Sequence, residues 1–209
     1  MPSDSVKYLG ISIDGYINWH AHEAVLSSKL SRALGMLSKI RHFVKHETLI
    51  MIYYGIFSSL LTYGSQILGQ NNVANKLQII QNKALRIINF KPSRNTASPL
   101  FKKCNILKLK DNISLQNFLF AHDSIKNNLP SPLLGQLSFV DTVHNTRNED
   151  CYQLDKPTNR TIIYGANSIK SKSVDIWNTI NRLHYSKKLH EKSRSICKLF
   201  VKTYFTDQY

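Results

Sequence analysis

Apolar residues recur along most of the chain at the period of an α-helix. They fall at steps of three and four residues over 20–43 and again over 72–90. The same spacing predicts shorter helices over 114–127, 173–183 and 188–204. The pattern therefore predicts a mainly α-helical fold, with a helical bundle as its largest part.

The N-terminal residues follow a different pattern. Residues 6–13 mix β-branched and aromatic residues with polar ones in alternation, and Asp14-Gly15 is a strong turn signal before residues 16–19. We therefore predict a short N-terminal β-hairpin whose turn lies at Asp14-Gly15.

A long uncharged segment lies between Glu47 and Lys76, and residues 49–57 are apolar on all sides. A membrane span needs about 18 or more consecutive apolar residues. Glycine and hydroxyl residues interrupt this segment from Gly55 onward. We therefore favour a central buried helix over a membrane span.

Breaks in these patterns divide the chain into four parts. They are the hairpin (1–22), a helical domain (23–138), an extended linker (139–165) and a C-terminal helical segment (166–209). The linker is assigned because residues 141–161 are polar, locally acidic and without a period. Prolines are expected to break the helices, since they disfavour helical backbone in the residue before them. The breaks are expected at Pro92, at Ser98-Pro99 and at Leu129-Pro130.

The net charge of +15 is concentrated in one stretch of the sequence. Residues 27–110 carry 14 basic side chains and one acidic side chain, Glu47. A concentrated positive patch suits an extended anion, whereas charge that serves solubility alone is usually spread. The sequence therefore predicts nucleic acid as the partner and indicates no small-molecule substrate.

Two of the predicted helices carry cations at helical spacing. The first has Lys29, Arg32 and Lys39, with His42 continuing the same stripe, and the second has Lys76, Lys83 and Arg86. We predict that both stripes contact phosphates of one nucleic acid, together with Arg94 in the basic stretch that follows. A merely solvated polar face is the alternative interpretation of either stripe.

Motifs for enzymatic chemistry are missing from the sequence. It contains no glycine-rich phosphate loop, dinucleotide-binding turn or nucleophile elbow, and His46-Glu47 lacks the second histidine of a zinc-protease helix. No cysteine or carboxylate cluster joins the histidine pairs His20/His22 and His42/His46, so we predict no metal site.

The cysteines and the first residues bear on localisation. The three cysteines lie far apart, which predicts reduced thiols and an intracellular protein. Residues 1–5 do not have the character of a signal peptide, so none is expected.

Short motifs recur in a characteristic order over residues 6–183. They are Tyr8-Leu9-Gly10-Ile11, Ile13-Asp14, Trp19, His22, Tyr53, Tyr63-Gly64, Gln81-Asn82-Lys83-Ala84-Leu85-Arg86, Pro99-Leu100-Phe101, Ile106-Leu107, Leu129-Pro130, Thr146-Arg147 and Trp177-Asn178. This ordered set resembles the C-terminal part of the reverse transcriptase (RNA-directed DNA polymerase) of non-LTR, LINE-type retrotransposons.

The resemblance implies a primer-grip hairpin, a helical thumb and the region that follows, which pack against the template–primer duplex. It also implies that Lys7, Tyr8, Leu9 and Gly10 approach the primer backbone, where glycine permits close contact. The helix stripes would then bind phosphates of the same RNA or DNA duplex.

The family's catalytic Tyr-x-Asp-Asp box precedes the hairpin, and this sequence has no Asp-Asp pair. The resemblance thus implies that a palm outside the chain would hold the magnesium, that this chain holds no cofactor, and that it does not polymerise DNA alone. A palm and fingers region would be a further partner. The alternatives are a basic membrane-associated protein and a protein-interaction module without nucleic acid.

Overall fold

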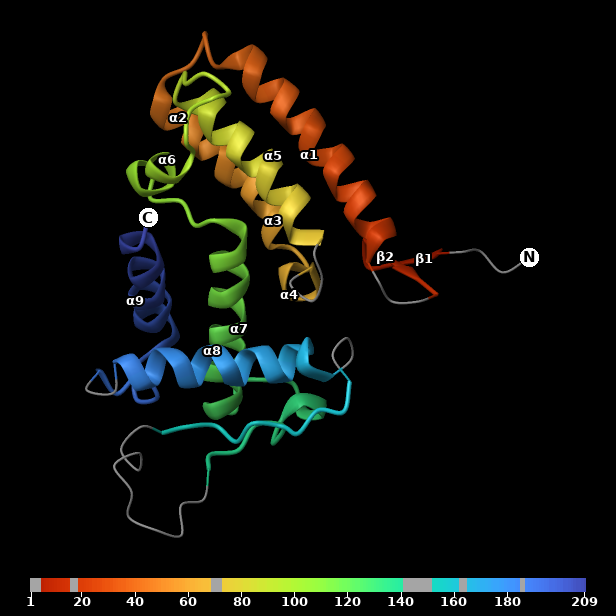
Figure 1. Cartoon of the computed structure of the whole chain (residues 1–209), viewed down its shortest axis with the longest axis vertical. Helices are drawn as coiled ribbons and strands as arrows, with labels where there is room; N and C mark the ends of the chain where they lie inside the picture. The colour runs from red at the N-terminus through yellow and green to blue at the C-terminus, as the bar shows by residue number, and fades with distance from the viewer. Residues whose placement is uncertain (1–4, 16–18, 69–72, 141–151, 162–164, 185–186) are drawn as a thin grey trace. The chain divides into compact units, whose positions relative to one another are not determined.

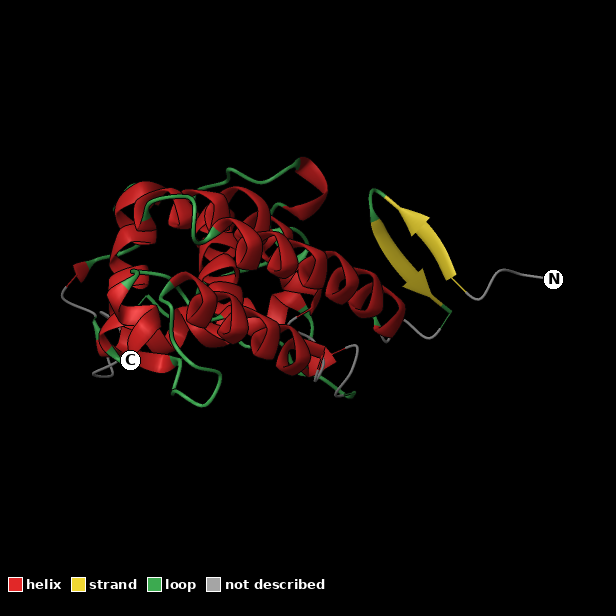
Figure 2. Cartoon of the chain, turned by 90° about the horizontal axis from the view of Figure 1, so that it is seen from above, coloured by secondary structure: helices red, strands yellow, loops and turns green. Residues whose placement is uncertain are grey.

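The computed structural model of the chain describes residues 5–15, 19–68, 73–140, 152–161, 165–184 and 187–209. As predicted, the fold is mainly α-helical with a two-stranded antiparallel hairpin near the N-terminus (Figure 2). The chain divides into two compact units: unit 1 comprises Met1–Ile113 and Phe205–Tyr209, and unit 2 comprises Ser114–Tyr204. This division falls inside a helix, whereas the sequence patterns place a boundary at residue 138.

Unit 1 contains the hairpin and the helices that follow it (Figure 1). Its elements are β1 (Ser5–Tyr8), β2 (Ile11–Asp14), α1 (His20–Ile40), α2 (His46–Ile52), the π-helix η1 (Tyr53–Ser58), α3 (Ser59–Thr62), α4 (Ser65–Leu68), α5 (Val73–Ile88) and α6 (Ser98–Lys103). The helices α1 and α5 run side by side in the same direction, and α2 to α3 returns along them.

The hairpin turns at Leu9-Gly10, so the prediction of a turn at Asp14-Gly15 was wrong. Tyr8 pairs with Ile11, and both residues between them have positive φ, 46° for Leu9 and 81° for Gly10. Two positive φ values are what a two-residue hairpin turn with the right strand twist requires, and Gly10 adopts one without strain. Of the second strand predicted at 16–19, residues 16–18 lie outside the described residues, and Trp19, with a φ of 65°, precedes α1 without being part of a strand.

The uncharged segment forms α2, η1 and α3 and buries one face of that helical run. Leu49, Tyr53, Phe57 and Leu61, spaced by four residues, are buried in the core of unit 1. Met51, with 72% of its surface exposed, lies on the opposite side, so the prediction of a helix buried all round was only half right. Among the described residues, no helix has the length and apolar character needed to cross a membrane.

Ser98-Pro99 begins a helix, contrary to the prediction that it breaks one. Pro99 occupies the first turn of α6, where a missing N–H costs nothing because that donor has no partner within the helix. The next helix, α7 (Leu109–Ile125), also begins five residues before the predicted start at 114.

Unit 2 is built around Trp177. It contains the rest of α7, η2 (Ser131–Leu133), α8 (Ile169–Leu183) and most of α9 (Arg194–Asp207). The Trp177 ring stacks on Phe118 of α7 at 5.0 Å between ring centroids. The helix predicted over 188–204 begins only at Arg194, because the backbone forms turns up to that point and Lys188 has a φ of 46°.

Part of the predicted linker is bound to α8. Asn178 on α8 accepts from the backbone N–H of Leu154 and donates to its carbonyl oxygen, both at 2.8 Å. The Trp177 indole donates to the carbonyl oxygen of Tyr152 at 3.0 Å. Leu154 also forms a β-bridge with Phe139. These contacts fix the chain next to Leu154, while residues 141–151 and 162–164 of the predicted linker lie outside the described residues.

Candidate nucleic-acid interface

The basic side chains of residues 27–110 all belong to unit 1. Eleven of the fourteen are exposed, and Arg41, Arg86 and Lys108 are half-buried. Within the part of the chain that the structure describes, Lys76 is the one member of this set in an ion pair. The others therefore keep a positive field that the described carboxylates do not neutralise by direct contact.

Lys76 has a structural contact within unit 1. Its ammonium lies 3.2 Å from a carboxylate oxygen of Glu23, which is buried on α1. His20 lies 3.6 Å from the same carboxylate. Because an unpaired carboxylate is costly to bury, Lys76 stabilises the packing of α5 on α1.

The stripe on α1 projects from one flank of the helix. Lys29, Arg32 and Lys39 are exposed and separated by one and two helical turns. Lys39 and Met36 line a shallow hollow of about 320 Å³ together with Ile52 and Ile56 of the neighbouring helical run. The α1 cations therefore lie on the flank that adjoins η1.

The cations of α5 separate into two groups. Lys83 is exposed two turns after Lys76, so both project from the flank of α5 that adjoins α1. Arg86 lines a different hollow, on the α6 side of α5. The structure thus distributes the predicted cations over three flanks of one bundle, without merging them into a single row.

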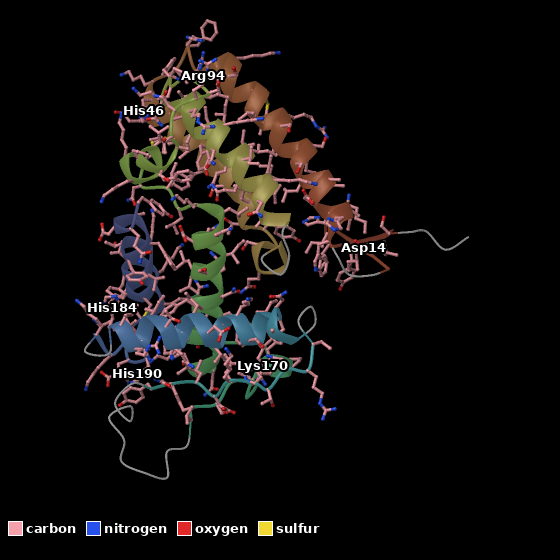
Figure 3. All side chains as sticks on the ribbon, in the orientation of Figure 1. Asp14, His46, Arg94, Lys170, His184 and His190 are labelled. Atoms are coloured by element: carbon pink, nitrogen blue, oxygen red, sulfur yellow. The ribbon has the colours of Figure 1, made fainter. Side chains whose placement is uncertain are left out.

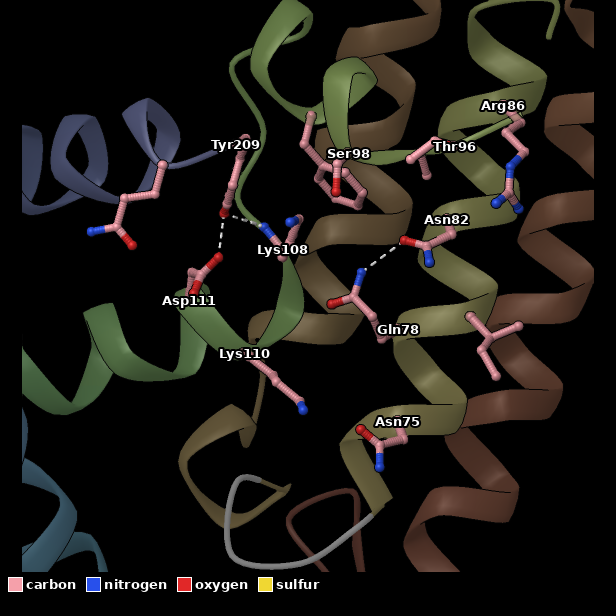
Figure 4. A pocket seen from close by; sticks show the side chains of 14 residues that line it. Asn75, Gln78, Asn82, Arg86, Thr96, Ser98, Lys108, Lys110, Asp111 and Tyr209 are labelled. Atoms are coloured by element: carbon pink, nitrogen blue, oxygen red, sulfur yellow. Dashed lines mark hydrogen bonds between the residues drawn. The ribbon is translucent and has the colours of Figure 1, made fainter. Parts of the chain in front are cut away.

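The hollow beside Arg86 has a volume of about 730 Å³, and most of the residues that line it have polar or charged side chains (Figure 4). Lys108 and Lys110 contribute two further cations to it, although the sequence did not assign them to the interface. The Arg86 Nε donates to the Asn95 carbonyl oxygen at 2.8 Å, which fixes the guanidinium at the rim. Arg86 and Lys110 are 24 positions apart in the sequence, and no spacing rule joins residues so distant.

One carboxylate lies in this hollow. Asp111 accepts a hydrogen bond from the Tyr209 hydroxyl, which itself accepts from the backbone N–H of Lys108 at 2.9 Å. Burial raises the pKa of Asp111. The Lys108 ammonium lies 4.3 Å from the centre of the Tyr209 ring. Asp111 is thus engaged by Tyr209, and the three cations dominate the charge of the hollow.

The hairpin residues of the predicted interface are exposed, and a hydrogen bond from Tyr63 attaches their turn to the rest of unit 1. Lys7, Tyr8, Leu9 and Gly10 all lie on the surface. The Tyr63 hydroxyl donates to the carbonyl oxygen of Leu9. The structure thereby brings together two of the motifs that carry the family resemblance.

A second contact attaches β2 to α1. The Ser12 N–H donates to Nδ1 of His22 at 3.5 Å, which requires that nitrogen to be unprotonated. Burial, with a smaller effect of the Lys29 charge, lowers the pKa of His22 below 6.5. The neutral imidazole is therefore the form that attaches the hairpin.

Arg94, the last predicted interface residue, is exposed beyond the C-terminal end of α5. Figure 3 places it at the same end of unit 1 as His46 and away from Asp14. The arrangement as a whole presents cations to the surface. Within the described ranges, no three His, Cys, Asp or Glu side chains gather as metal ligands.

Comparisons with protein families, with curated proteins and with solved structures gave no match for this chain.

Proposed function

We propose that unit 1 binds the sugar–phosphate backbone of a nucleic acid duplex without sequence preference. In this proposal the chain resembles the thumb and following region of a non-LTR retrotransposon reverse transcriptase and holds a template–primer duplex. The proposal concerns binding alone and gives this chain no catalytic residue and no cofactor of its own.

One observation carries the proposal. Residues 27–110 place fourteen cations in unit 1 against one carboxylate of the same stretch, and these cations are mostly exposed and not ion-paired within the described chain. Binding of a duplex releases the counterions condensed on its phosphates, and each cation that contacts a phosphate contributes to that release.

The dimensions of the helices suit this partner. Lys29 and Lys39 are ten residues apart, which corresponds to about 15 Å along α1 at ~1.5 Å per residue. A duplex carries one charge per ~1.7 Å of its axis, so such a stripe can follow several phosphates. The hairpin residues Lys7 to Gly10 would contact the backbone of the same duplex.

Charge reversal tests the proposal. Lys29, Arg32 and Lys83 are exposed and take part in no ion pair with the described residues, so changing all three to Glu should leave the fold intact. Lys76 is left unchanged because its loss would remove the ion pair of the buried Glu23 carboxylate. We expect the triple variant of the full chain to lose at least about 100-fold in duplex affinity, since each lost phosphate contact reduces the electrostatic term.

A matched control uses three exposed cations of unit 2. Lys170, Arg182 and Lys198 are changed to Glu, which alters the net charge by the same amount. We expect this control to bind the duplex much more tightly than the first variant. Equal affinities of the wild-type chain and the unit 1 variant would instead favour a protein-interaction module whose basic surface is only solvated.

A further inference from the structure

The segments that follow α1 and α5 contact each other at one end of unit 1. The Arg41 guanidinium lies 5.2 Å from the centre of the Phe90 ring. The His42 ring meets the same ring edge-on at 5.6 Å, and Arg41 Nε donates to His42 Nε2 at 3.0 Å. Arg94 and His46 lie at this end of the unit (Figure 3). We call the set Arg41, His42, Phe43, Phe90, Lys91 and Arg94 the aromatic end.

Phe90 has an unfavourable backbone conformation. The Lys91 N–H donates to the Arg86 carbonyl oxygen at 2.9 Å, and the Phe90 N–H donates to the Ile87 carbonyl oxygen at 3.2 Å. These two bonds are the Schellman ending of a helix, in which the left-handed residue is usually glycine. Here it is Phe90, with a φ of 53°. A strained residue of this kind is a reason to look for a function.

Two aromatic rings of this end face solvent. Phe43 is 86% exposed and Phe90 is 52% exposed. Phe90 is thus half exposed to solvent at a position where glycine would be easier to accommodate. Phe43 is almost wholly exposed. Arg41 and His42 cover part of the Phe90 ring, while the rest of that ring and most of Phe43 stay open to solvent.

The charge of the same segments is strongly positive. Residues 41–47 and 90–95 contain the cations Arg41, Lys45, Lys91 and Arg94 and one carboxylate, that of Glu47. Cations beside exposed aromatic rings match unpaired nucleotides, which offer phosphates to the cations and base faces to the rings. Paired bases inside a duplex offer no such faces.

We propose that the aromatic end binds single-stranded nucleotides that extend beyond the duplex. Bases stack on Phe43 and Phe90, while Lys91 and Arg94 contact the phosphates between them. This inference rests on the proposed function and adds a second kind of contact to it, since the helix flanks recognise only backbone charge.

The experiment compares two ligands with the full chain by fluorescence anisotropy. One is a blunt duplex, and the other is the same duplex with a short single-stranded extension. Stacking on an aromatic side chain contributes ~1–3 kcal/mol per base, which corresponds to about 5- to 150-fold in affinity. We expect the extension to tighten binding by at least about fivefold, and Phe43→Ala with Phe90→Ala to abolish that gain.

Three controls separate stacking from folding. Phe43→Tyr with Phe90→Tyr keeps both rings and should keep the gain. Leu199→Ala removes an apolar side chain of unit 2 whose exposed fraction, 67%, lies between those of the two rings, and it should change neither affinity. Phe90→Gly removes the backbone strain, so the melting temperature should not fall, while the contribution of this ring to the gain is lost.

The outcomes distinguish the two proposals. If the duplex binds but the extension adds nothing, or if both alanine substitutions leave the gain intact, the aromatic end is not a stacking site and the proposed function stands. If neither ligand binds, both proposals fail. If the alanine variant instead loses binding to phosphatidylserine vesicles and the extension adds nothing, the aromatic end is a lipid contact and the inference is overturned.

Discussion

Gln81 connects three segments of unit 1. Its amide nitrogen donates to the Tyr53 hydroxyl and to the carbonyl oxygen of Leu107, both at 2.9 Å. Its amide oxygen accepts from the Leu109 N–H at 3.0 Å and from the Gln78 side chain at 2.9 Å. Although Gln81 belongs to a motif of the family resemblance, it is buried and stabilises the fold without facing the candidate interface.

Removal of this side chain should therefore destabilise unit 1. We expect Gln81→Ala to lower the free energy of unfolding by about 2–3 kcal/mol, because it removes the donor to the buried Tyr53 hydroxyl and to the carbonyl oxygen of Leu107. Urea unfolding measures the change. Asn75→Ala, on the exposed side of the same helix, is the control, and an equally small effect of both substitutions would contradict this role of Gln81.

His22 makes the attachment of the hairpin depend on pH. Burial lowers its pKa in the folded chain, so below about pH 6.5 the unfolded chain binds more protons than the folded one. The contribution of neutral His22 to the free energy of unfolding is therefore complete above that pH. It is lost as the pH falls towards the pKa of His22 in the folded chain.

We accordingly expect the free energy of unfolding to fall between about pH 7 and about pH 5, and to fall less in His22→Gln. Denaturant unfolding at several pH values measures both slopes. His46→Gln changes an exposed histidine of unit 1 and should keep the wild-type slope. If the free energy of unfolding changes with pH as steeply in His22→Gln as in the wild-type chain, His22 is not the cause of the pH dependence.

At the scale of elements, Asn178 holds an extended segment against α8. Its amide side chain pairs with both backbone groups of Leu154, as a neighbouring strand would. Leu154 itself is buried. A single side chain thus substitutes for a sheet partner in unit 2.

Asn178→Ala should release this segment. Two backbone groups lose their partners, so we expect a loss of about 2 kcal/mol and faster hydrogen exchange at the Leu154 amide. Asn178→Asp keeps the acceptor but loses the donor. Its stability and its exchange rate at Leu154 should lie between those of the wild-type chain and of Asn178→Ala. Thr179→Ala, on the exposed face of α8, should exchange like the wild-type chain. Unchanged exchange at Leu154 in Asn178→Ala would show that other contacts hold the segment.

The helices were predictable because their apolar faces repeat at a fixed period, as the burial of Leu26, Leu30, Ala33 and Leu37 on α1 illustrates. The hairpin was predictable as an element, but its turn was not. Asp14-Gly15 is the stronger local signal, whereas the turn at Leu9-Gly10 contacts Tyr63, which is more than fifty residues away in the sequence. Boundaries set by such distant contacts leave no local pattern.

The surface exposure of the helix cations was predictable from their spacing, but their arrangement was not. Spacing placed Lys29, Arg32 and Lys39 on one flank, because the helical period alone decides that. It could not tell that Lys76 pairs with a buried carboxylate on another helix, or that Arg86 shares a hollow with Lys108 and Lys110. These facts depend on how helices pack, which the positions of charges do not specify.

At the scale of the whole molecule, the two units use their charges differently. In unit 2, cations meet nearby carboxylates: Lys156 lies 2.7 Å from Asp175, and Arg194 lies 2.9 Å from Asp123. In unit 1, the stretch 27–110 has almost no carboxylates to offer. The positive charge available to a polyanion is therefore densest in residues 27–110 of unit 1.

The salt dependence of duplex binding by the full chain tests the central claim most directly. If about five phosphates are neutralised, the logarithm of the association constant should fall against the logarithm of salt concentration with a slope of about −4.5. Raising the salt from about 50 to about 200 mM should then weaken binding roughly 500-fold. A slope near zero would contradict the account, because contacts between cations and phosphates cannot form without releasing counterions.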